Sequence, residues 1–237
     1  MKAIILASGL ATRLKPLSDS EPKPLTEIGN ETILSRILNS LIKNNVKEVV
    51  ITTGYLEEKI KKYVSKKFPQ IKVEFVFNPR FKETNYIYSM WLAKEYLKNT
   101  DVLYLHGDSF YDSSLIKKLI DFPHSGALIK RNLVSQKDFN ALVKDGLITK
   151  IGVKVFGKGA NFCLPVYKFL EKDWQMWMEK IDGFVEKKEV SCYAEDALNM
   201  VFDQLKFYPV YYDKEYGMEI DDLEDLKIAE AIIEKKI

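Results

Sequence analysis

Near its N-terminus the chain carries residues whose types and spacing suit phosphate binding. The stretch LASGLATRLKP at residues 6–16 places small residues and Arg13 directly after an apolar run, and Lys23 follows between two prolines. Small residues let backbone N–H groups approach an anion. Arginine offers phosphate oxygens a planar fork, and lysine offers a mobile point charge. These features predict a phosphate-binding loop whose first residues are Leu6, Ala7, Ser8 and Gly9.

The loop differs from two common phosphate-binding motifs. The dinucleotide fingerprint needs G-x-G-x-x-G, whereas Gly9 stands alone here. A Walker A loop needs G-K-[ST], which does not follow this glycine. A surface loop with incidental basic residues is the ordinary alternative for Arg13 or Lys23 taken singly, but not for the whole combination.

Two aspartates are candidates for binding a divalent cation. Asp108 follows a predicted strand and Gly107, and Asp221 lies just before the last predicted helix. A carboxylate from each would suit Mg²⁺, which prefers hard oxygen ligands. The ordinary alternatives are a turn aspartate at Asp108 and a helix N-cap at Asp221, for which Asp222 is the competing cap.

The first half of the chain alternates between predicted strands and helices. Apolar or β-branched runs predict strands at 2–7, 46–53, 72–77 and 102–105, and helical spacing predicts helices over 32–43, 56–67 and 86–97. Such a succession favours an α/β fold with parallel strands and right-handed crossovers. In such sheets ligands bind beyond the carboxyl ends of the strands, where Leu6–Gly9 and Asp108 would lie.

The second half has a less regular pattern. It predicts short strands at 126–131, 141–143 and 147–155, and helices over 167–180 and 194–205. A strand at 206–212 and a helix over 222–235 follow. Trp174 and Trp177 lie at a helical interval, which favours core packing. We expect a single α/β domain over residues 1–237, with a β-rich insertion at about 126–165.

Composition excludes several classes of protein. The 36 basic and 34 acidic side chains give a net charge of +2, which makes no case for a nucleic-acid partner. Cys163 and Cys192 show no spacing typical of a disulfide framework or a zinc site. No apolar stretch approaches the length of about 18 residues that a membrane span needs. With no signal-peptide pattern, we expect a cytoplasmic protein, either a monomer or a homodimer.

The N-terminal segment MKAIILASGLATRLKPLSDSEPKPL resembles the signature of the sugar-nucleotide pyrophosphorylases and related nucleotidyltransferases, L-A-x-G-x-x-x-R…P-K. The resemblance extends to TGY at 53–55, NP…TNYIYSM at 78–90, HGD at 106–108 and EID at 219–221. Two positions depart from the pattern: Ala11 replaces a usual second glycine, and Ser8 replaces a frequent alanine. Neither departure removes a charge.

The resemblance implies a Rossmann-like nucleotidyltransferase fold, a mostly parallel mixed sheet flanked by helices. It also implies a Mg²⁺-dependent reaction in which a phosphomonoester attacks the α-phosphorus of a nucleoside triphosphate and pyrophosphate leaves. Arg13 and Lys23 would be the catalytic cations, and Asp108 and Asp221 the metal ligands. The attacking phosphate is already anionic, so no general base is needed and His106 is expected to be structural. Besides the residues of the loop, the nucleotide would contact Asn78, Asn85, Ser89 and Gly107.

The string TNYIYSM resembles the cytidylyltransferase branch that uses phosphocholine, which makes CTP the expected nucleotide. Two asparagine amides suit the edge of cytosine or uracil equally well. The two tryptophans that this branch has near its acceptor are absent, while Phe139 and Tyr193 remain. Glu195 or Asp196 would bind an ammonium group. A carboxylate would bind one of three cations, namely Lys130, Arg131 or Lys137.

This polar set suits an acceptor that bears amine, carboxylate or amide groups. The whole chain resembles the cytidylyltransferases that act on L-glutamine phosphate, and this resemblance places L-glutamine phosphate ahead of phosphocholine. The product would be CDP-L-glutamine, as in the bacterial enzymes of capsule phosphoramidate biosynthesis. A sugar 1-phosphate is a further alternative. A glycosyltransferase would be expected to carry a D-x-D motif with two carboxylates, whereas Gly107-Asp108-Ser109 has only one. A non-catalytic nucleotide-binding module would gain nothing from keeping both aspartates and both cations.

Overall fold

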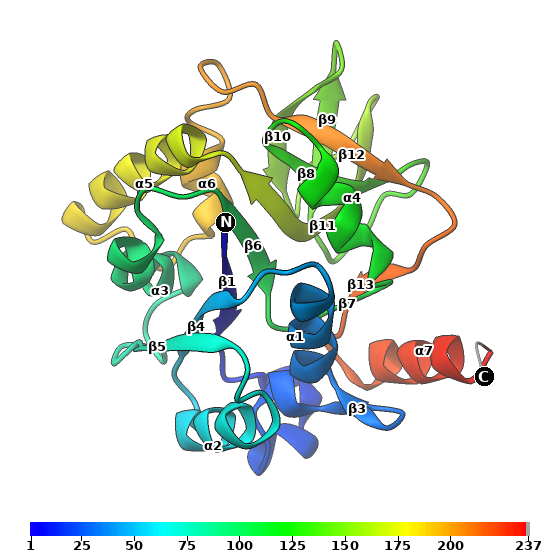
Figure 1. Cartoon of the computed structure of the whole chain (residues 1–237). Coiled ribbons are helices and arrows are strands. Elements are labelled where there is room, and N and C mark those ends of the chain that lie inside the picture. Colours follow the sequence, from blue (N-terminus) through cyan, green and yellow to red (C-terminus); the bar gives the residue numbers. More distant parts are fainter. Residues whose placement is uncertain (236–237) are drawn as a thin grey trace.

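A nine-stranded mixed sheet forms the centre of the protein, with strand order β10-β9-β11-β6-β1-β4-β5 and the pair β8 and β12 attached through β11 (Figure 1). The structure is a computed structural model that describes residues 1–235, so the last two positions of the predicted domain 1–237 lie outside the described residues. The strands are β1 (Lys2–Ala7), β2 (Glu27–Ile28), β3 (Glu31–Thr32), β4 (Glu48–Thr53), β5 (Lys72–Phe77), β6 (Val102–His106), β7 (Ser109–Tyr111), β8 (Gly126–Lys130), β9 (Asn140–Lys144), β10 (Leu147–Gly152), β11 (Ala160–Phe169), β12 (Tyr208–Tyr212) and β13 (Gly217–Glu219).

Helices cover both faces of this sheet, as a mostly parallel α/β architecture requires. The expected fold class is therefore confirmed. The α-helices are α1 (Ile33–Lys43), α2 (Glu57–Lys67), α3 (Tyr86–Ala93), α4 (Ser114–Asp121), α5 (Glu171–Glu186), α6 (Ala194–Leu198) and α7 (Leu223–Glu234), and the 3₁₀ turns are η1 (Thr12–Leu14), η2 (Leu17–Asp19), η3 (Lys23–Leu25) and η4 (Lys94–Leu97).

The strands β6, β1, β4 and β5 run parallel, with β1 in the middle. Alternate residues of β1 face opposite sides of the sheet: Ile5 packs in the core on the α1 side, and Ile4 packs in the core on the α3 and α5 side. Both faces of the strand are thus buried, which explains why its sequence is an unbroken apolar run. The carboxyl end of β1 delivers Leu6 and Ala7 to the edge where the predicted phosphate loop begins.

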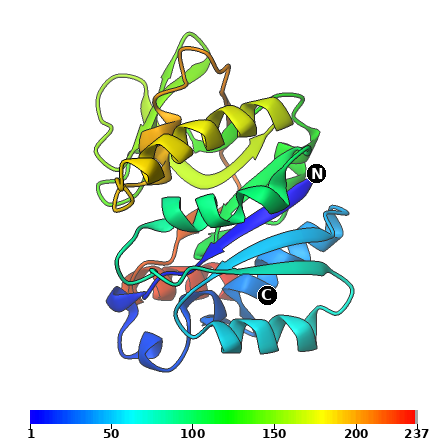
Figure 2. The same cartoon turned by 90° about the vertical axis from the view of Figure 1, so that its left-hand side faces the viewer.

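The second half of the chain extends the sheet with antiparallel strands. In Figure 2 these antiparallel strands lie in the upper part with α5 and α6, while α2, the opening loop and the red C-terminal helix lie in the lower part (Figure 2). Strand β11 pairs antiparallel with β6, β8 and β9. The predicted helix over 167–180 is wrong at its start, because Tyr167 and Phe169 end this strand and α5 begins at Glu171. Trp174 and Trp177 are buried in the core, as expected.

The predicted helix over 194–205 is also too long, since α6 ends at Leu198. The side chain of Asn199 accepts a hydrogen bond from Ile151 N at 2.8 Å and donates one to Ile151 O at 2.8 Å. These two bonds tie the chain to β10 at the residue after the helix. The other predicted elements are present, with ends that differ by a few residues, whereas β2, β3, β7, α4 and β11 were not predicted.

A separate two-stranded pairing brings distant parts of the chain together. Strands β7 and β13 run antiparallel with Ser109 opposite Glu219, and Ile220 N donates to Asp108 O at 3.0 Å. This pairing places Asp108 beside the segment that carries Asp221.

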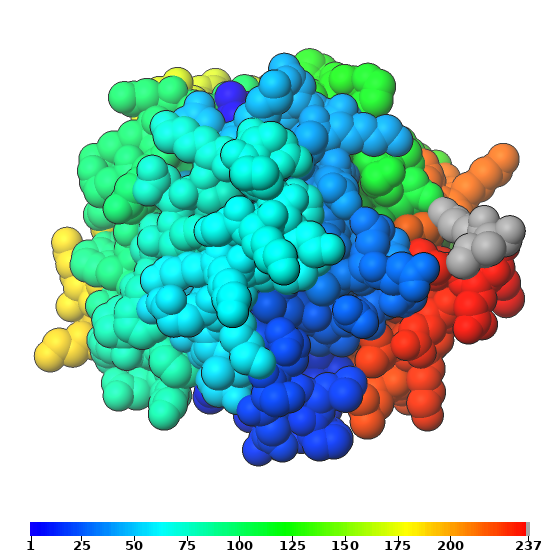
Figure 3. Space-filling view, turned by 60° about the horizontal axis from the view of Figure 1, so that its bottom comes forward, coloured from blue at the N-terminus to red at the C-terminus, as the bar shows by residue number. Residues whose placement is uncertain are grey.

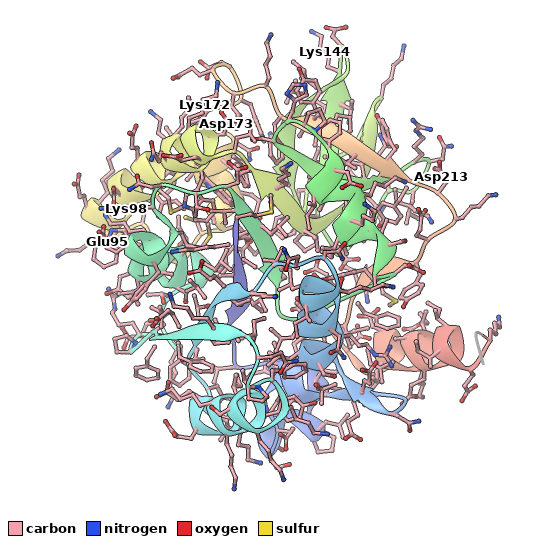
Figure 4. All side chains as sticks on the ribbon, viewed as in Figure 1. Glu95, Lys98, Lys144, Lys172, Asp173 and Asp213 are labelled. Atoms are coloured by element: carbon pink, nitrogen blue, oxygen red, sulfur yellow. The ribbon has the colours of Figure 1, made fainter. Side chains whose placement is uncertain are left out.

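The opening loop between β1 and α1 packs beside α2. Tyr55 Oη donates to Asp19 O at 3.0 Å, and Lys59 Nζ donates to Ser20 O at 2.5 Å. On the face in Figure 3 this loop lies at the bottom in blue, between cyan residues around α2 and the red C-terminal helix (Figure 3). At the far end of the sheet, Lys144 at the tip of the β9–β10 hairpin points outward (Figure 4). Within residues 1–235 no helix combines the length and the apolar character that a membrane span requires.

Candidate active site

A cleft of about 700 Å³ opens at the carboxyl end of β1, and a second cavity of about 340 Å³ adjoins it. The two share six lining residues, so they form one continuous site: Leu6, Gly9, Leu10, Arg13, Asp108 and Asp221. The larger cavity is also lined by Ser8, Asn85, Phe139 and Tyr193, and the smaller by Ala7, Lys23 and Gly107. The cleft therefore lies where the parallel-sheet rule places a ligand.

The four charged residues that the sequence singled out meet in this cleft. Lys23 Nζ lies 2.5 Å from Asp108 Oδ2 and 2.7 Å from Asp221 Oδ1. Arg13 Nη2 lies 2.9 Å from the other oxygen of Asp221. Lys23 opens the turn η3, where the flanking Pro22 and Pro24 restrict the backbone. One ammonium thus joins two carboxylates that are themselves far apart in the sequence.

This contact shifts the protonation equilibria of its members. Burial acts to lower the pKa of Lys23, but the charges and hydrogen bonds of the two aspartates outweigh it and hold this pKa above its ordinary value. Burial acts to raise the pKa of Asp108, but the positive charge of Lys23 holds it below its ordinary value. Both groups therefore stay charged at neutral pH.

Asp222, and not Asp221, caps the last helix. The side chain of Asp222 accepts hydrogen bonds from Glu224 N at 2.9 Å and Asp225 N at 3.0 Å. Because this neighbour satisfies the N-terminus of α7, the carboxylate of Asp221 is free to face the cleft.

Glu219 is a third carboxylate in the cleft, and the residue-level prediction missed it. The only signal was its place in the string EID at 219–221. Its Oε1 lies 3.1 Å from His106 Nδ1, and His106 Nε2 lies 2.7 Å from Tyr104 Oη. Burial, together with the negative charges of Asp108 and Asp221, raises the pKa of Glu219 to about 7. His106 is buried and hydrogen-bonded on both ring nitrogens, and it also belongs to the lining of the cleft.

The carboxylates are suited to a divalent cation. Asp108 Oδ1 is buried and has no hydrogen-bond partner among residues 1–235. Single side-chain atoms of His106, Asp108 and Glu219 lie within 4.8 Å of one another. Carboxylate oxygens are the ligands that Mg²⁺ prefers, and a buried oxygen without a partner is costly to leave unpaired. The donor set therefore fits a hard cation such as Mg²⁺.

Two glycines line the site, Gly9 in the opening loop and Gly107 in the turn between β6 and β7, and they differ in whether the fold requires a glycine there. A Cβ on Gly107 would lie 2.6 Å from Leu6 O, so the close packing of β1 against this turn demands glycine. A Cβ on Gly9 would meet no atom within 4 Å. Packing within the protein therefore does not require glycine at position 9. A ligand that approaches the backbone closely in the cleft would require it. Ala11 has a φ of 51°, a conformation that favours the glycine usual there in the resembled family.

Of the predicted base contacts, Asn85 lines the cleft, while Asn78 and Ser89 lie behind it. Asn78 Nδ2 donates to Ser89 Oγ at 2.9 Å and to Thr84 Oγ1 at 3.1 Å. Ser89 Oγ lies 2.9 Å from Ser8 Oγ. These buried side chains hold the loop 78–85 against the phosphate loop, so in the described structure they support the cleft from outside its lining.

The predicted acceptor residues divide into two groups. Phe139 and Tyr193 line the cleft, with ring centroids 5.1 Å apart. Glu195 is 1% exposed, and its carboxylate accepts hydrogen bonds from Tyr86 Oη at 2.5 Å and Tyr104 Oη at 3.3 Å. Asp196 accepts from Tyr193 N at 3.1 Å at the start of α6. Neither acidic side chain belongs to the lining of the cleft.

The three candidate cations for a carboxylate also differ in position. Lys137 lines the cleft, where its Nζ lies 2.6 Å from Asp225 Oδ1. Lys130 donates to Asp213 O at 2.6 Å, and the guanidinium of Arg131 lies 4.0 Å from the ring centroid of Tyr211. Only Lys137 of these three is placed to meet a ligand in the cleft.

Carboxylates and cations gathered beyond the strand ends of an α/β sheet form an arrangement that is suited to a phosphorylated ligand. Residues 2–149 match the family model described as nucleotidyl transferase. The chain belongs to this family, which confirms the resemblance found in its N-terminal signature.

Similar proteins include enzymes with different acceptors. A choline-phosphate cytidylyltransferase of Streptococcus pneumoniae is 27% identical over 245 residues and covers 100% of both chains. A CTP:phosphoglutamine cytidylyltransferase of Campylobacter jejuni is 28% identical over 135 residues, which are 54% of this chain and 52% of that protein. A solved structure of a CTP:phosphocholine cytidylyltransferase from Streptococcus pneumoniae matches 98% of both chains with a TM-score of 0.83 and 23% identity, which shows the shared fold.

Proposed function

We propose that the protein is a Mg²⁺-dependent cytidylyltransferase that transfers CMP from CTP to phosphocholine. A phosphate oxygen of the acceptor bonds to the α-phosphorus of CTP, and the bond from that phosphorus to the bridging oxygen of the β-phosphate breaks. The products are CDP-choline and pyrophosphate. The observation that carries this proposal is a set of ion pairs near the carboxyl end of β1. They join Lys23 and Arg13 to Asp108 and Asp221.

The charged residues have separate tasks in this proposal. Asp108 and Asp221 would hold Mg²⁺, with Glu219 beside them, and the bound ion would neutralise the phosphates and offset the repulsion between two anions. Lys23 lies next to both carboxylates, so its ammonium would stabilise the charge that develops around the α-phosphorus. Arg13 is largely exposed at the rim, where it would bind the leaving pyrophosphate.

The nucleotide would lie along the small residues that follow β1. Ser8 and Gly9 line the cleft, and the open space at Gly9 allows the backbone to approach the triphosphate. Asn85 and Thr84 also line it and offer amide and hydroxyl groups to a pyrimidine edge. Cytosine is favoured over uracil by the relatives that use CTP.

The acceptor wall is more aromatic than the sequence suggested. Tyr86, Phe139 and Tyr193 line the cleft, and aromatic faces attract quaternary ammonium groups. The acidic residues that favoured phosphoglutamine, Glu195 and Asp196, lie outside the lining. Phosphocholine is therefore our first acceptor, and the pneumococcal relative that matches the whole chain supports it. Phosphoglutamine is the second candidate, because Lys137 in the cleft would bind its carboxylate.

An assay of the purified protein with Mg²⁺ tests this proposal. We would incubate each of the four nucleoside triphosphates with phosphocholine, phosphoglutamine, phosphoethanolamine or a sugar 1-phosphate. Pyrophosphate release would be followed, and products would be identified by mass spectrometry. The proposal expects CDP-choline as the main product, no turnover with chelator, and no turnover of an Asp108→Asn protein that circular dichroism shows to be folded. Turnover confined to a sugar 1-phosphate, or to another nucleotide, would contradict it.

A further inference from the structure

One wall of the cleft contains a carboxylate that the proposed chemistry does not use. Asp138 lies in the loop between β8 and β9 and lines the cleft beside Phe139. Its Oδ2 accepts a hydrogen bond from Ser135 Oγ at 2.8 Å. Its Oδ1 is buried and has no hydrogen-bond partner among the residues that the structure describes. A buried carboxylate oxygen that the protein leaves unpaired indicates a partner from outside the chain.

The nearby cations of the protein are bound elsewhere. Lys137 Nζ contacts Asp225 at 2.6 Å and Asp222 at 3.2 Å, and Arg13 contacts Asp221. Burial raises the pKa of Asp138 above its ordinary value, although the hydrogen bond from Ser135 and the charge of Lys137 act to lower it. A cationic ligand in the cleft would offset the cost of burying this carboxylate.

Aromatic rings line the same cleft as this carboxylate. Phe139 follows Asp138 in the chain and meets Tyr193 edge to face at 5.1 Å, and Tyr193 lies 6.0 Å from Tyr86. All three rings line the same cleft. A carboxylate beside aromatic rings is the combination that attracts an organic ammonium ion, through its charge and through the ring quadrupoles.

The loop that carries Asp138 is fixed by a buried polar side chain. Asn140 is fully buried, its Nδ2 donates to Ser135 O at 2.8 Å, and its Oδ1 accepts from Ser135 N at 2.9 Å. The backbone around Asp138 is therefore positioned before any ligand binds. A preorganised charge of this kind contributes to specificity because it costs little to order on binding.

We infer that Asp138 binds the ammonium group of the phosphomonoester acceptor and so selects cationic acceptors over neutral ones of the same shape. The inference rests on the proposed function and narrows the substrate class of that site. It assigns the acceptor charge to Asp138 in place of Glu195 and Asp196.

The experiment compares phosphocholine with 3,3-dimethylbutyl phosphate, its neutral isostere with carbon in place of nitrogen. We would measure kcat and KM for both acceptors, and for phosphoethanolamine, in the wild type, Asp138→Asn and Ser135→Ala. The wild type is expected to favour phosphocholine over the isostere by about tenfold or more in kcat/KM. In Asp138→Asn this ratio falls towards one through a higher KM for phosphocholine, while the KM for CTP stays the same. Ser135→Ala removes the hydrogen bond to Asp138 Oδ2 but keeps the charge of the carboxylate, so most of the preference should remain.

Three results would separate the possible failures. An equal fall with both acceptors in Asp138→Asn, or a preference lost as completely in Ser135→Ala as in Asp138→Asn, would show that the charge of Asp138 does not select the acceptor and would overturn the inference. CDP-choline formation with no preference over the isostere would also overturn the inference, while the proposed function would stand. Turnover with a sugar 1-phosphate but with none of these acceptors would overturn the proposed function itself. A preference for phosphoethanolamine over the isostere, lost in Asp138→Asn, would support the inference with a primary ammonium.

Discussion

Lys23 is the residue on which the charge balance of the cleft depends. Its ammonium lies between two carboxylates that would otherwise repel each other at close range, and it is only 13% exposed. Breaking a largely buried ion pair by removing one partner usually destabilises a protein by about 3–5 kcal/mol. The same ammonium faces the smaller cavity, where a phosphate would gain from it. Structural and chemical roles are therefore combined in one side chain.

Replacing this lysine should affect turnover much more than any exposed lysine does. We expect Lys23→Met to lower kcat by about 100-fold or more, because one fixed group that stabilises the transition state is lost. Lys144→Met is the matched control, since Lys144 points outward at the hairpin tip, and it should retain full activity (Figure 4). The measurement is pyrophosphate release at saturating substrates, with circular dichroism to verify folding. A folded Lys23→Met protein with an unchanged rate would remove Lys23 from the mechanism.

Gly9 offers a test in which stability and binding move in opposite directions. Its φ lies outside the left-handed region and a Cβ would meet no protein atom. We expect Gly9→Ala to leave the free energy of unfolding unchanged or to raise it by up to about 1 kcal/mol. The added methyl group would obstruct the triphosphate, so the Kd for CTP should rise about tenfold. Calorimetric titration and thermal unfolding measure the two effects. Unchanged CTP affinity would place the nucleotide elsewhere.

At the scale of elements, the pairing of β7 with β13 assembles the carboxylates. Asp108 and Asp221 are distant in the chain, and they are brought together because Ser109 pairs with Glu219. The turn that joins β6 to β7 contains Gly107, which packs against the end of β1. This turn thus sets the distance between the phosphate loop and Asp108.

A pair of glycine substitutions tests that packing. Gly107→Ala would place a methyl group 2.6 Å from Leu6 O, which should cost about 1–3 kcal/mol of stability and displace Asp108. Gly183→Ala is the control: Gly183 lies in α5 with open space around it, and alanine there should stabilise the helix by about 1 kcal/mol. Urea unfolding and turnover would be measured for both. Full activity in Gly107→Ala would show that the end of β1 tolerates the displacement.

At the scale of the molecule, three parts of the chain contribute to one cleft. The parallel half supplies the phosphate loop, the insertion between β8 and β11 supplies Asp138 and Phe139, and the strand β13 leads to Asp221. Neither half holds all the groups that the proposed reaction requires. Changes in the insertion can thus alter acceptor specificity while the phosphate loop that would bind the nucleotide stays the same.

The parts that the sequence predicted well have strong local signals. Strands β1 and β5 were predicted with their observed bounds, because β-branched or apolar runs end there at small residues or Asn78-Pro79. Strand β11 was missed because Pro165 argues against a central strand, and a register shift between Leu164 and Tyr167 accommodates it. The positions of Glu195 and Asp138 depend on tertiary packing, for which no local signal exists.

The carboxylate pair itself was inferred through a family resemblance. No spacing in the sequence shows that Asp108 and Asp221 meet, since this depends on the pairing of β7 with β13. Once that pairing is known, the directions of the pKa shifts of Lys23 and Asp108 follow from the opposite charges that face each other.

The central claim is that Asp108 and Asp221 together hold the divalent ion that the reaction requires. A crystal structure with CTP and Mn²⁺, examined by anomalous scattering, tests it most directly. The account predicts one metal peak about 2.0–2.2 Å from an oxygen of each aspartate and next to the phosphates of CTP. A metal bound away from both aspartates, or a triphosphate bound away from the end of β1, would contradict it.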